Sequence, residues 1–356
     1  MSSDPAIDIS VVVVNYGTAE LTIAAVESVL TRSHGGRRVD VHLVDNASPN
    51  GDGARLAAAM TRPGWAGRVH FYPETVNHGF GRGNNLVFRR LAAQPVPPRH
   101  VFLLNPDARL DNEAIAILAD TLEANPQAGF AGAAVERPDS GAATAAFRFP
   151  SLLSEFSHHL AFGPVAKLFA RWRVPLPPDH PEGQVDWLVG AAVMARLDVL
   201  KQIDFFDPAF FLYYDEVDLM QRARDAGWTS LYVPRARVHH AEGAATGVRS
   251  GESFRKRRPA YWYRSWGWYF RRHHGRAGAL AILAATLTGT VLNQIQRRLR
   301  RLPPSGAIWA FWDFATVSAW TILFGTTAST SGLPDPAPAD GGGHPAGTVR
   351  LQKDAG

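Results

Sequence analysis

The stretch ISVVVVNYG, residues 9–17, decides the class of fold. Residues 9–14 form a short, β-branched and almost wholly apolar run, which predicts a strand buried on both faces of a parallel sheet. Asn15 and Gly17 break this run, and Thr18 opens a segment whose apolar residues recur with a helical period. Thr18 is therefore the expected N-cap of a helix. The stretch predicts a strand–helix unit.

The same alternation recurs three more times along the chain. Strands are predicted over residues 39–44, 69–72 and 101–104, and helices over 54–60, 84–93 and from an Asp111 cap to about 124. Four such units in a row predict a doubly wound, mainly parallel α/β sheet flanked by helices.

Polar residues follow three of these strands, in the segments 15–17, 45–48 and 105–107. Ligands bind outside the carboxyl ends of the strands in such sheets, so these segments are candidate parts of a binding site. Each segment is also compatible with an ordinary turn, because Asn and Asp are common turn residues.

The composition narrows the classes of protein. The 356 residues are 46% hydrophobic and 19% charged and include no cysteine. This excludes a disordered chain, a disulfide scaffold and any thiolate zinc site or cysteine nucleophile. The net charge of +5 is uneven: residues 251–356 carry +9 and the first 250 carry −4. The start of the chain shows no targeting segment, so we expect a cytoplasmic catalytic part.

The later part of the chain is less regular. Residues 137–184 contain seven prolines and are expected to form an irregular, acceptor-facing insertion. Order is predicted to return in a strand-like segment at 185–194, a helix at 196–203, an aromatic loop at 204–214, a helix at 215–226 and a strand at 231–233.

The C-terminal region is divided into basic and apolar segments. Residues 251–276 are basic and Trp-rich, and apolar runs follow at 277–292 and 308–325. Both runs are at or below the length that crosses a bilayer, so helices lying on an anionic membrane surface are expected. Packed core helices and a spanning hairpin are the alternatives. The predicted organisation is a catalytic domain over 1–250, a membrane-associating region over 251–328 and a disordered tail over 329–356.

Two groups of side chains have the chemistry of an active site. Asp107 ends a buried strand in LLNPD, where a carboxylate suits Mg²⁺ or Mn²⁺, and His239 or His240 can add a nitrogen ligand. Asp215 and Glu216 follow an aromatic stretch that can exclude water. Exclusion of water raises the pKa of a carboxyl group toward the working pH, as a general base requires. They also open a helix, where the dipole favours carboxylates for purely structural reasons. Asp218 is expected to have a structural role, as a cap or paired with Arg222.

The glycine-rich loop NHGFGRGNN, residues 77–85, precedes a predicted helix. Such a loop lets backbone N–H groups approach a phosphate. It is neither a dinucleotide fingerprint nor a P-loop.

Six motifs follow one another along the chain: VVVVNYGTAELTIAAVESV, VDNASPNGDG, NHGFGRGNN, FLLNPDA, DWLVGAAVMARLDVL and FDPAFFLYYDEVDLMQRARDAGW. They occur in the order found in family 2 glycosyltransferases of the Rossmann-like GT-A fold, and the chain most resembles their bacterial rhamnosyltransferase branch. The resemblance covers residues 8–247 and weakly extends to about 275.

The resemblance implies roles for particular residues. Asp45 corresponds to the residue that contacts the nucleobase, and Asp107 and His240 correspond to the ligands of Mg²⁺ or Mn²⁺. The usual Glu-Asp pair is reversed here, so Glu216 is the first choice for the base and Asp215 the reserve. The residues implied to contact the nucleotide-sugar are Asn15, Tyr16, Gly17, Asp45, Asn77, Gly79, Phe80, Asn84, Asn105, Trp187 and Gly190.

The expected activity is an inverting, metal-dependent transfer of a sugar, with rhamnose as the first candidate. The donor is a dTDP- or UDP-linked sugar, and the acceptor is a lipid-linked saccharide or a cell-envelope polysaccharide. The enzyme is expected at the inner face of the cell membrane, bound to its anionic surface and not to nucleic acid. The reversed Asp-Glu pair leaves an inactive scaffold of an envelope-assembly complex as an alternative. A sugar-phosphate nucleotidyltransferase is disfavoured, because no basic, Gly-rich loop follows the first strand.

Overall fold

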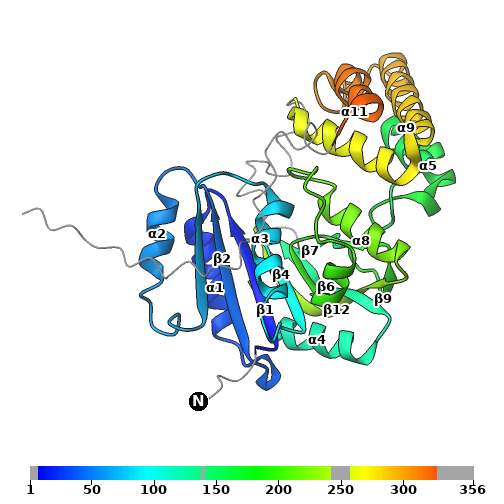
Figure 1. The fold of residues 1–356 in the computed structure, drawn as a ribbon. Helices are drawn as coiled ribbons and strands as arrows, with labels where there is room; N and C mark the ends of the chain where they lie inside the picture. The colour runs from blue at the N-terminus through cyan, green and yellow to red at the C-terminus, as the bar shows by residue number, and fades with distance from the viewer. Residues whose placement is uncertain (1–6, 138–140, 242–256, 327–356) are drawn as a thin grey trace, which may run out of the picture.

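The computed structural model describes residues 7–137, 141–241 and 257–326, which form an α/β body and a helical lobe (Figure 1). The predicted tail lies outside the described residues, as does the start of the basic stretch. The sheet has the order β3-β2-β1-β4-β11-β6-β12-β5, with β7 beside β6 and β9 beside β12. Its strands are β1 Ile9–Asn15, β2 Val39–Asn46, β3 Val69–Glu74, β4 His100–Leu104, β5 Ala108–Leu110, β6 Ala128–Arg137, β7 Gly141–Ala143, β9 Gly183–Val185, β11 Ala192–Arg196 and β12 Thr229–His240.

The first four strands of this order are parallel, as the repeated units predict. Beyond them β11 runs antiparallel to both β4 and β6, while β12 is parallel to β6. A separate ribbon pairs β8 (Ala146–Phe147) with β10 (Trp187–Leu188). The helices of the body are α1 Ala19–Leu30, α2 Asp52–Ala59, α3 Phe80–Ala92, α4 Ala114–Ala124, α7 Leu197–Gln202 and α8 Asp215–Asp225.

Thr18 stands at the N-cap position of α1, as predicted, but its side chain makes no cap hydrogen bond. Its hydroxyl donates to Asn15, and the amide of Ala19 donates to Asp52 at 2.9 Å. Two other local expectations need correction. Asp111 does not cap α4, because its carboxylate binds Arg237 and His239. Helix α3 begins at Phe80 and not at Asn84, so part of the glycine-rich loop is helical.

The proline-rich insertion is more ordered than expected. It contains α5 (Leu152–Leu160), α6 (Gly163–Leu168) and a short 3-10 turn, Ala170–Trp172. A capping box at Ser151 and Ser154 starts α5. Glycine at 289 lets α9 approach closely, because a side chain there would lie 2.8 Å from the carbonyl oxygen of Phe156 in α5. The insertion therefore contributes to the helical lobe.

The helical lobe has a core of its own. It consists of α9 (Ala260–Leu299), which bends at Gly275, then α10 (Ala310–Asp313), a π turn (Phe314–Ser318) and α11 (Ala319–Phe324). Trp266 is buried and donates to Glu155, and Trp268 donates to Asp207. Trp266 is therefore part of the core of the lobe, and Trp268 is partly buried against the body. By length and composition α9 is able to span a membrane, a property that it shares with core helices.

Candidate active site

A cavity of about 530 Å³ opens at the carboxyl ends of β1, β2 and β4, where the sheet topology predicts a ligand site. Its walls bring together residues from β1, the glycine-rich loop, β12 and the start of α8. Ten of the predicted site residues line it: Tyr16, Asn77, Gly79, Phe80, Asn105, Asp107, Gly190, Asp215, Glu216 and His240.

Asp107 and His240 meet in the wall of this cavity. Asp107 lies in the turn between β4 and β5, and His240 ends β12, which pairs with β5. Asp107 Oδ1 is 2.9 Å from His240 Nε2, and both residues are buried. His239 faces the other way and binds Asp111. One carboxylate and one imidazole on a cavity wall fit a divalent cation such as Mn²⁺ and leave positions for oxygen atoms of a substrate.

Asp215 and Glu216 differ in environment although they are neighbours. Asp215 is fully buried, and its Oδ2 has no hydrogen-bond partner among the described residues. Burial, followed by the charge of Glu216 and a hydrogen bond with it, raises the pKa of Asp215 well above its usual value. Glu216 lines the cavity at the first turn of α8, where the helix dipole stabilises a carboxylate. Glu216 is therefore the better placed of the two to accept a proton.

The backbone before Asp215 is strained. Tyr213 and Tyr214 have φ angles of 68° and 65°, in the left-handed region that non-glycine residues seldom occupy. This turn places Tyr213 in the cavity wall directly ahead of the two carboxylates. Gly190 faces Glu216 across the cavity, and a side chain there would lie 3.6 Å from Glu216 Oε1.

Asn46, at the end of β2, organises the glycine-rich loop. Its amide donates to Asn77 Oδ1 at 3.0 Å and to the carbonyl of Gly79 at 2.9 Å, and its Oδ1 accepts from the amide of His78. Gly79 has φ 79°, and a side chain there would lie 1.9 Å from the carbonyl oxygen of Phe211. The predicted Asn84 bonds the carbonyl of Phe80 inside α3 and does not line the cavity. Asn46 belongs to the candidate segment 45–48, but its place at a strand end gave it no particular role in the sequence.

Asn15, Gly17 and Asp45 lie outside the cavity wall. The amide of Asn15 donates to Asp45 Oδ1 and Ser48 Oγ, and its Oδ1 accepts from Thr18 and Thr22. Ser48 Oγ also accepts from the amide of Gly17. In this structure Asn15 joins the strand ends of β1 and β2 through a fully used set of hydrogen bonds.

A second cavity of about 830 Å³ lies between the body and the helical lobe, and Tyr213 and Glu216 line both cavities. Trp187 lines this second cavity only, stacked on Phe147 at 4.0 Å. Three cationic side chains also line it: Lys167, Arg173 and Arg258. Burial raises the pKa of Glu155 in its wall to about 7, although the Trp266 hydrogen bond opposes the shift.

The helical lobe also reaches the first cavity. Tyr261, in the first turn of α9, lines it and stacks on Tyr213 with ring centroids 6.2 Å apart. Phe211 completes this aromatic wall, with its ring centroid 5.3 Å from that of Tyr261. Sequence analysis did not identify Tyr261, because nothing in the local pattern shows that α9 returns to the catalytic body.

The sequence comparison identifies the family. Residues 5–263 match the profile described as glycosyltransferase like family 2. This chain belongs to that family. The family and the GT-A fold predicted from the motifs are confirmed, and the protein is a glycosyltransferase enzyme.

Two relatives of this glycosyltransferase are rhamnosyltransferases. It is 31% identical over 223 residues to N-acetylglucosaminyl-diphospho-decaprenol L-rhamnosyltransferase of Mycobacterium tuberculosis, which covers 59% of this chain and 69% of that protein. It is 23% identical over 167 residues to rhamnosyltransferase WbbL of Escherichia coli K12, covering 46% of this chain and 61% of that protein.

A solved structure supports the fold. The crystal structure of GalNAc-T7 with UDP, GalNAc and Mn²⁺ superposes with a TM-score of 0.50 at 13% sequence identity. The match covers 67% of this glycosyltransferase and 44% of that chain, so this chain spans less than half of that protein. The likeness concerns the fold alone.

Proposed function

We propose that this glycosyltransferase moves a sugar from a dTDP- or UDP-linked donor to a hydroxyl of a lipid-linked saccharide or a cell-envelope polysaccharide. The observation that carries the proposal is that Glu216 lies in the wall of both cavities. The smaller cavity would hold the donor, and the larger one would bring the acceptor hydroxyl to the same carboxylate. Rhamnose is the first candidate sugar, because both named bacterial relatives are rhamnosyltransferases.

Asp107 and His240 would hold Mg²⁺ or Mn²⁺ beside the donor diphosphate. The bound ion supplies positive charge that offsets the negative charge of the leaving diphosphate. Asn77, Gly79 and Phe80 shape the pocket around the donor, with Asn46 holding the loop in place. Asn15 and Asp45 would act from behind the cavity wall, by fixing the strand ends on which the nucleotide rests.

Transfer would proceed as a single displacement with inversion. Glu216 accepts the proton of the acceptor hydroxyl while that oxygen bonds to the anomeric carbon of the sugar. The bond from the anomeric carbon to the diphosphate oxygen breaks, and the nucleoside diphosphate leaves with its electron pair. Burial, followed by the charge of Glu216, raises the pKa of Asp215, so Asp215 would be the poorer candidate for the base.

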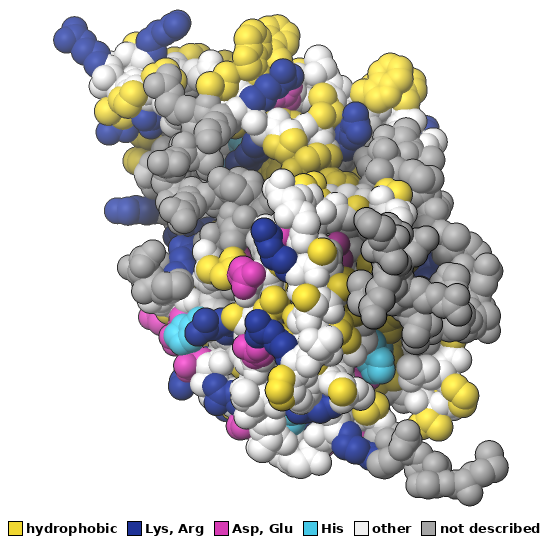
Figure 2. Space-filling view, turned by 90° about the vertical axis from the view of Figure 1, so that its left-hand side faces the viewer, with side chains coloured by type: hydrophobic (Ala, Val, Ile, Leu, Met, Phe, Trp, Pro, Cys, Tyr) yellow, Lys and Arg dark blue, Asp and Glu magenta, His cyan; other side chains and the backbone are white. Residues whose placement is uncertain are grey.

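We further propose that residues 1–250 form the catalytic domain and that 251–328 hold it at the cytoplasmic face of an anionic membrane. The exposed apolar side chains of the helical lobe support this, together with the arginines of 297–301. The helical lobe is at the top of the molecule in Figure 1 and Figure 2, and yellow side chains gather beside dark blue ones there in Figure 2. A lipid-linked acceptor, such as the one named for the mycobacterial relative, would then enter from the membrane.

The test is a panel of sugar nucleotides offered to the purified full chain with Mg²⁺ or Mn²⁺. We expect one donor, dTDP-rhamnose in the first instance, to bind and to be consumed only with metal and acceptor present. A polyprenyl-diphosphate-linked acceptor and a polysaccharide acceptor are compared side by side. Failure of every donor to bind or to be hydrolysed would favour the scaffold alternative.

A further inference from the structure

A row of polar side chains crosses three neighbouring strands of the sheet, away from both cavities. Ser10 on β1 is opposite Asp40 on β2, and His42 on β2 is opposite His70 on β3, with Tyr72 two residues further along β3. The row lies on the face covered by α3, whose Arg90 stacks over the Tyr72 ring. Asp40 is five residues before Asp45 on an extended strand, which is about 16 Å at the usual rise. The row is therefore separate from the proposed donor site.

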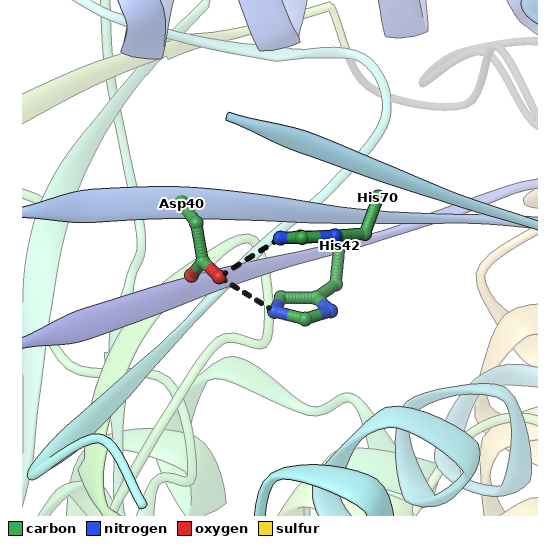
Figure 3. A group of neighbouring side chains, drawn as sticks. All are labelled: Asp40, His42 and His70. Carbon is green, nitrogen blue, oxygen red and sulfur yellow. Dashed lines mark hydrogen bonds and ion pairs between the residues drawn. The ribbon is translucent and has the colours of Figure 1, made fainter. Parts of the chain in front are cut away.

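Three of these side chains converge on one point (Figure 3). Asp40 Oδ2 lies 3.1 Å from His42 Nε2 and 3.3 Å from His70 Nε2. The three ligand atoms all lie within 4.8 Å of one another. Asp40 and His42 are buried, and the side chain of His70 is 46% exposed.

The spacing matches a tetrahedral metal ion. Zinc binds nitrogen and carboxylate oxygen at about 2.0–2.1 Å, which places neighbouring ligand atoms of a tetrahedron about 3.3 Å apart. The two distances from Asp40 are close to this value. The third is brought into range by rotation of the half-exposed His70 side chain. Two imidazoles and one carboxylate favour zinc over Mg²⁺ or Ca²⁺, which prefer oxygen ligands alone.

The surrounding hydrogen bonds are those of a metal site. Metal-binding histidines bond a second group through the other ring nitrogen, and binding carboxylates are themselves hydrogen-bonded. His42 Nδ1 is 2.9 Å from the Tyr72 hydroxyl, which leaves Nε2 directed at Asp40. The hydroxyl of Ser10 donates to the other carboxylate oxygen, Asp40 Oδ1, at 2.7 Å. Both contacts hold the ligand atoms in place.

We propose that Asp40, His42 and His70 bind a zinc ion, with water in the fourth position. The ion links β3, the first strand in the order of the sheet, to its neighbour β2. Because β3 leads directly into the loop that carries Asn77 and Gly79, the zinc steadies the scaffold of the donor pocket without taking part in transfer. This site is distinct from the Asp107–His240 pair and does not depend on the proposed function.

The test is zinc titration of the full chain after removal of metals by a chelator. Excess Mg²⁺ is present to compete with zinc at the Asp107–His240 pair. Bound zinc is counted by elemental analysis, and thermal unfolding is followed in parallel. We expect one zinc ion per chain and a higher melting temperature, because an ion that binds only the folded state stabilises it. His70→Gln should weaken zinc binding at least 100-fold and abolish the shift, while remaining folded.

The matched control is His239→Gln. His239 is also 46% exposed and hydrogen-bonded to a carboxylate, that of Asp111, but it belongs to no such group among the described residues. This variant should retain wild-type zinc binding. Absence of zinc binding in the wild type would show that the triad is held by hydrogen bonds alone and would overturn the proposal. Equal zinc affinity in wild type and His70→Gln would overturn it as well, by placing the ion elsewhere.

Discussion

At the scale of single residues, two carboxylates that are adjacent in sequence have opposite chemistry. Asp215 is buried with a raised pKa, whereas Glu216 lies in the wall of both cavities. The reversed order of this pair, which left the base in doubt at the level of sequence, therefore has a physical interpretation. Both carboxylates line the smaller cavity, but the longer Glu216 side chain also lines the larger one, whereas the buried Asp215 has a raised pKa.

Asp215→Asn should be tolerated. Asparagine has the size of a neutral aspartic acid, so the buried site loses no volume and gains no charge. We expect the melting temperature to remain within a few degrees of the wild type and the transfer rate to fall less than about tenfold, below the usual effect of losing a general base. Steady-state kinetics and thermal unfolding check this. Complete loss of transfer in a folded Asp215→Asn protein would assign the base to Asp215.

Glu155 should make stability depend on pH. Its folded pKa of about 7 lies above the ordinary value of 4.5, so its contribution is fully present at low pH and is lost as pH rises through about 7. The change is on the order of 3 kcal/mol between these values. Urea unfolding at pH 5 and pH 8 should show this loss in the wild type and not in Glu155→Gln. The exposed Glu20→Gln variant should behave like the wild type, and an equal pH dependence in Glu155→Gln would contradict the prediction.

At the scale of elements, the glycine-rich loop is fixed by contacts from two other segments. Asn46 on β2 holds its start, and the amide of Phe80 donates to the carbonyl of Phe211 at 3.0 Å. The loop therefore depends on close approach of the aromatic segment that precedes α8.

Gly79→Ala should disrupt the donor pocket. The added methyl would meet the Phe211 carbonyl, in addition to the cost of a positive φ angle, which is about 1–2 kcal/mol. Gly67→Ala is the control, because Gly67 has φ 72° with nothing within 4 Å of an added side chain. Both variants should lose stability, but only Gly79→Ala should lose donor binding, by at least tenfold, in a calorimetric titration. Similar donor affinity in the two variants would show that the loop is dispensable.

The first half of the fold was predictable from sequence, and much of the lobe was not. Strands β1, β2, β3 and β4 have local, strongly apolar patterns, so their positions follow from periodicity. The burial of Trp266 depends instead on Glu155, which is 111 residues away in the chain, and no local pattern reveals that contact. The same holds in the site: Asp107 and Glu216 stand in recognisable motifs, whereas Tyr261 reaches the cavity only through tertiary packing.

At the scale of the whole molecule, the cations of the basic C-terminal region divide between ion pairs within the protein and the exposed surface. Some of its cations form ion pairs with other parts of the protein: Arg257 binds Asp313, and Arg272 binds Asp207 and Asp218. Asp218 also pairs with Arg222, as the sequence predicts. The exposed aromatic side chains of the lobe, Trp309, Trp312 and Trp320, follow these residues in the sequence.

Membrane binding should depend on the exposed tryptophans of the lobe. Trp309, Trp312 and Trp320 are 60%, 59% and 65% exposed, and tryptophan is favoured at membrane interfaces. Replacing all three with serine should reduce flotation with anionic vesicles at least tenfold without unfolding the protein. Val96→Ser, which changes an apolar side chain that is 63% exposed on the body, is the control. Unchanged flotation of the triple variant would contradict the prediction that these tryptophans contact the membrane.

The most direct test of the account is a transfer assay of Glu216→Gln with a saturating nucleotide-sugar and a lipid-linked acceptor. Donor affinity should be unchanged, and the transfer rate should be at least about 100-fold lower, which is the loss expected on removing a general base. A folded Glu216→Gln enzyme that transfers sugar at the wild-type rate would contradict the central claim that Glu216 is the general base for the acceptor hydroxyl.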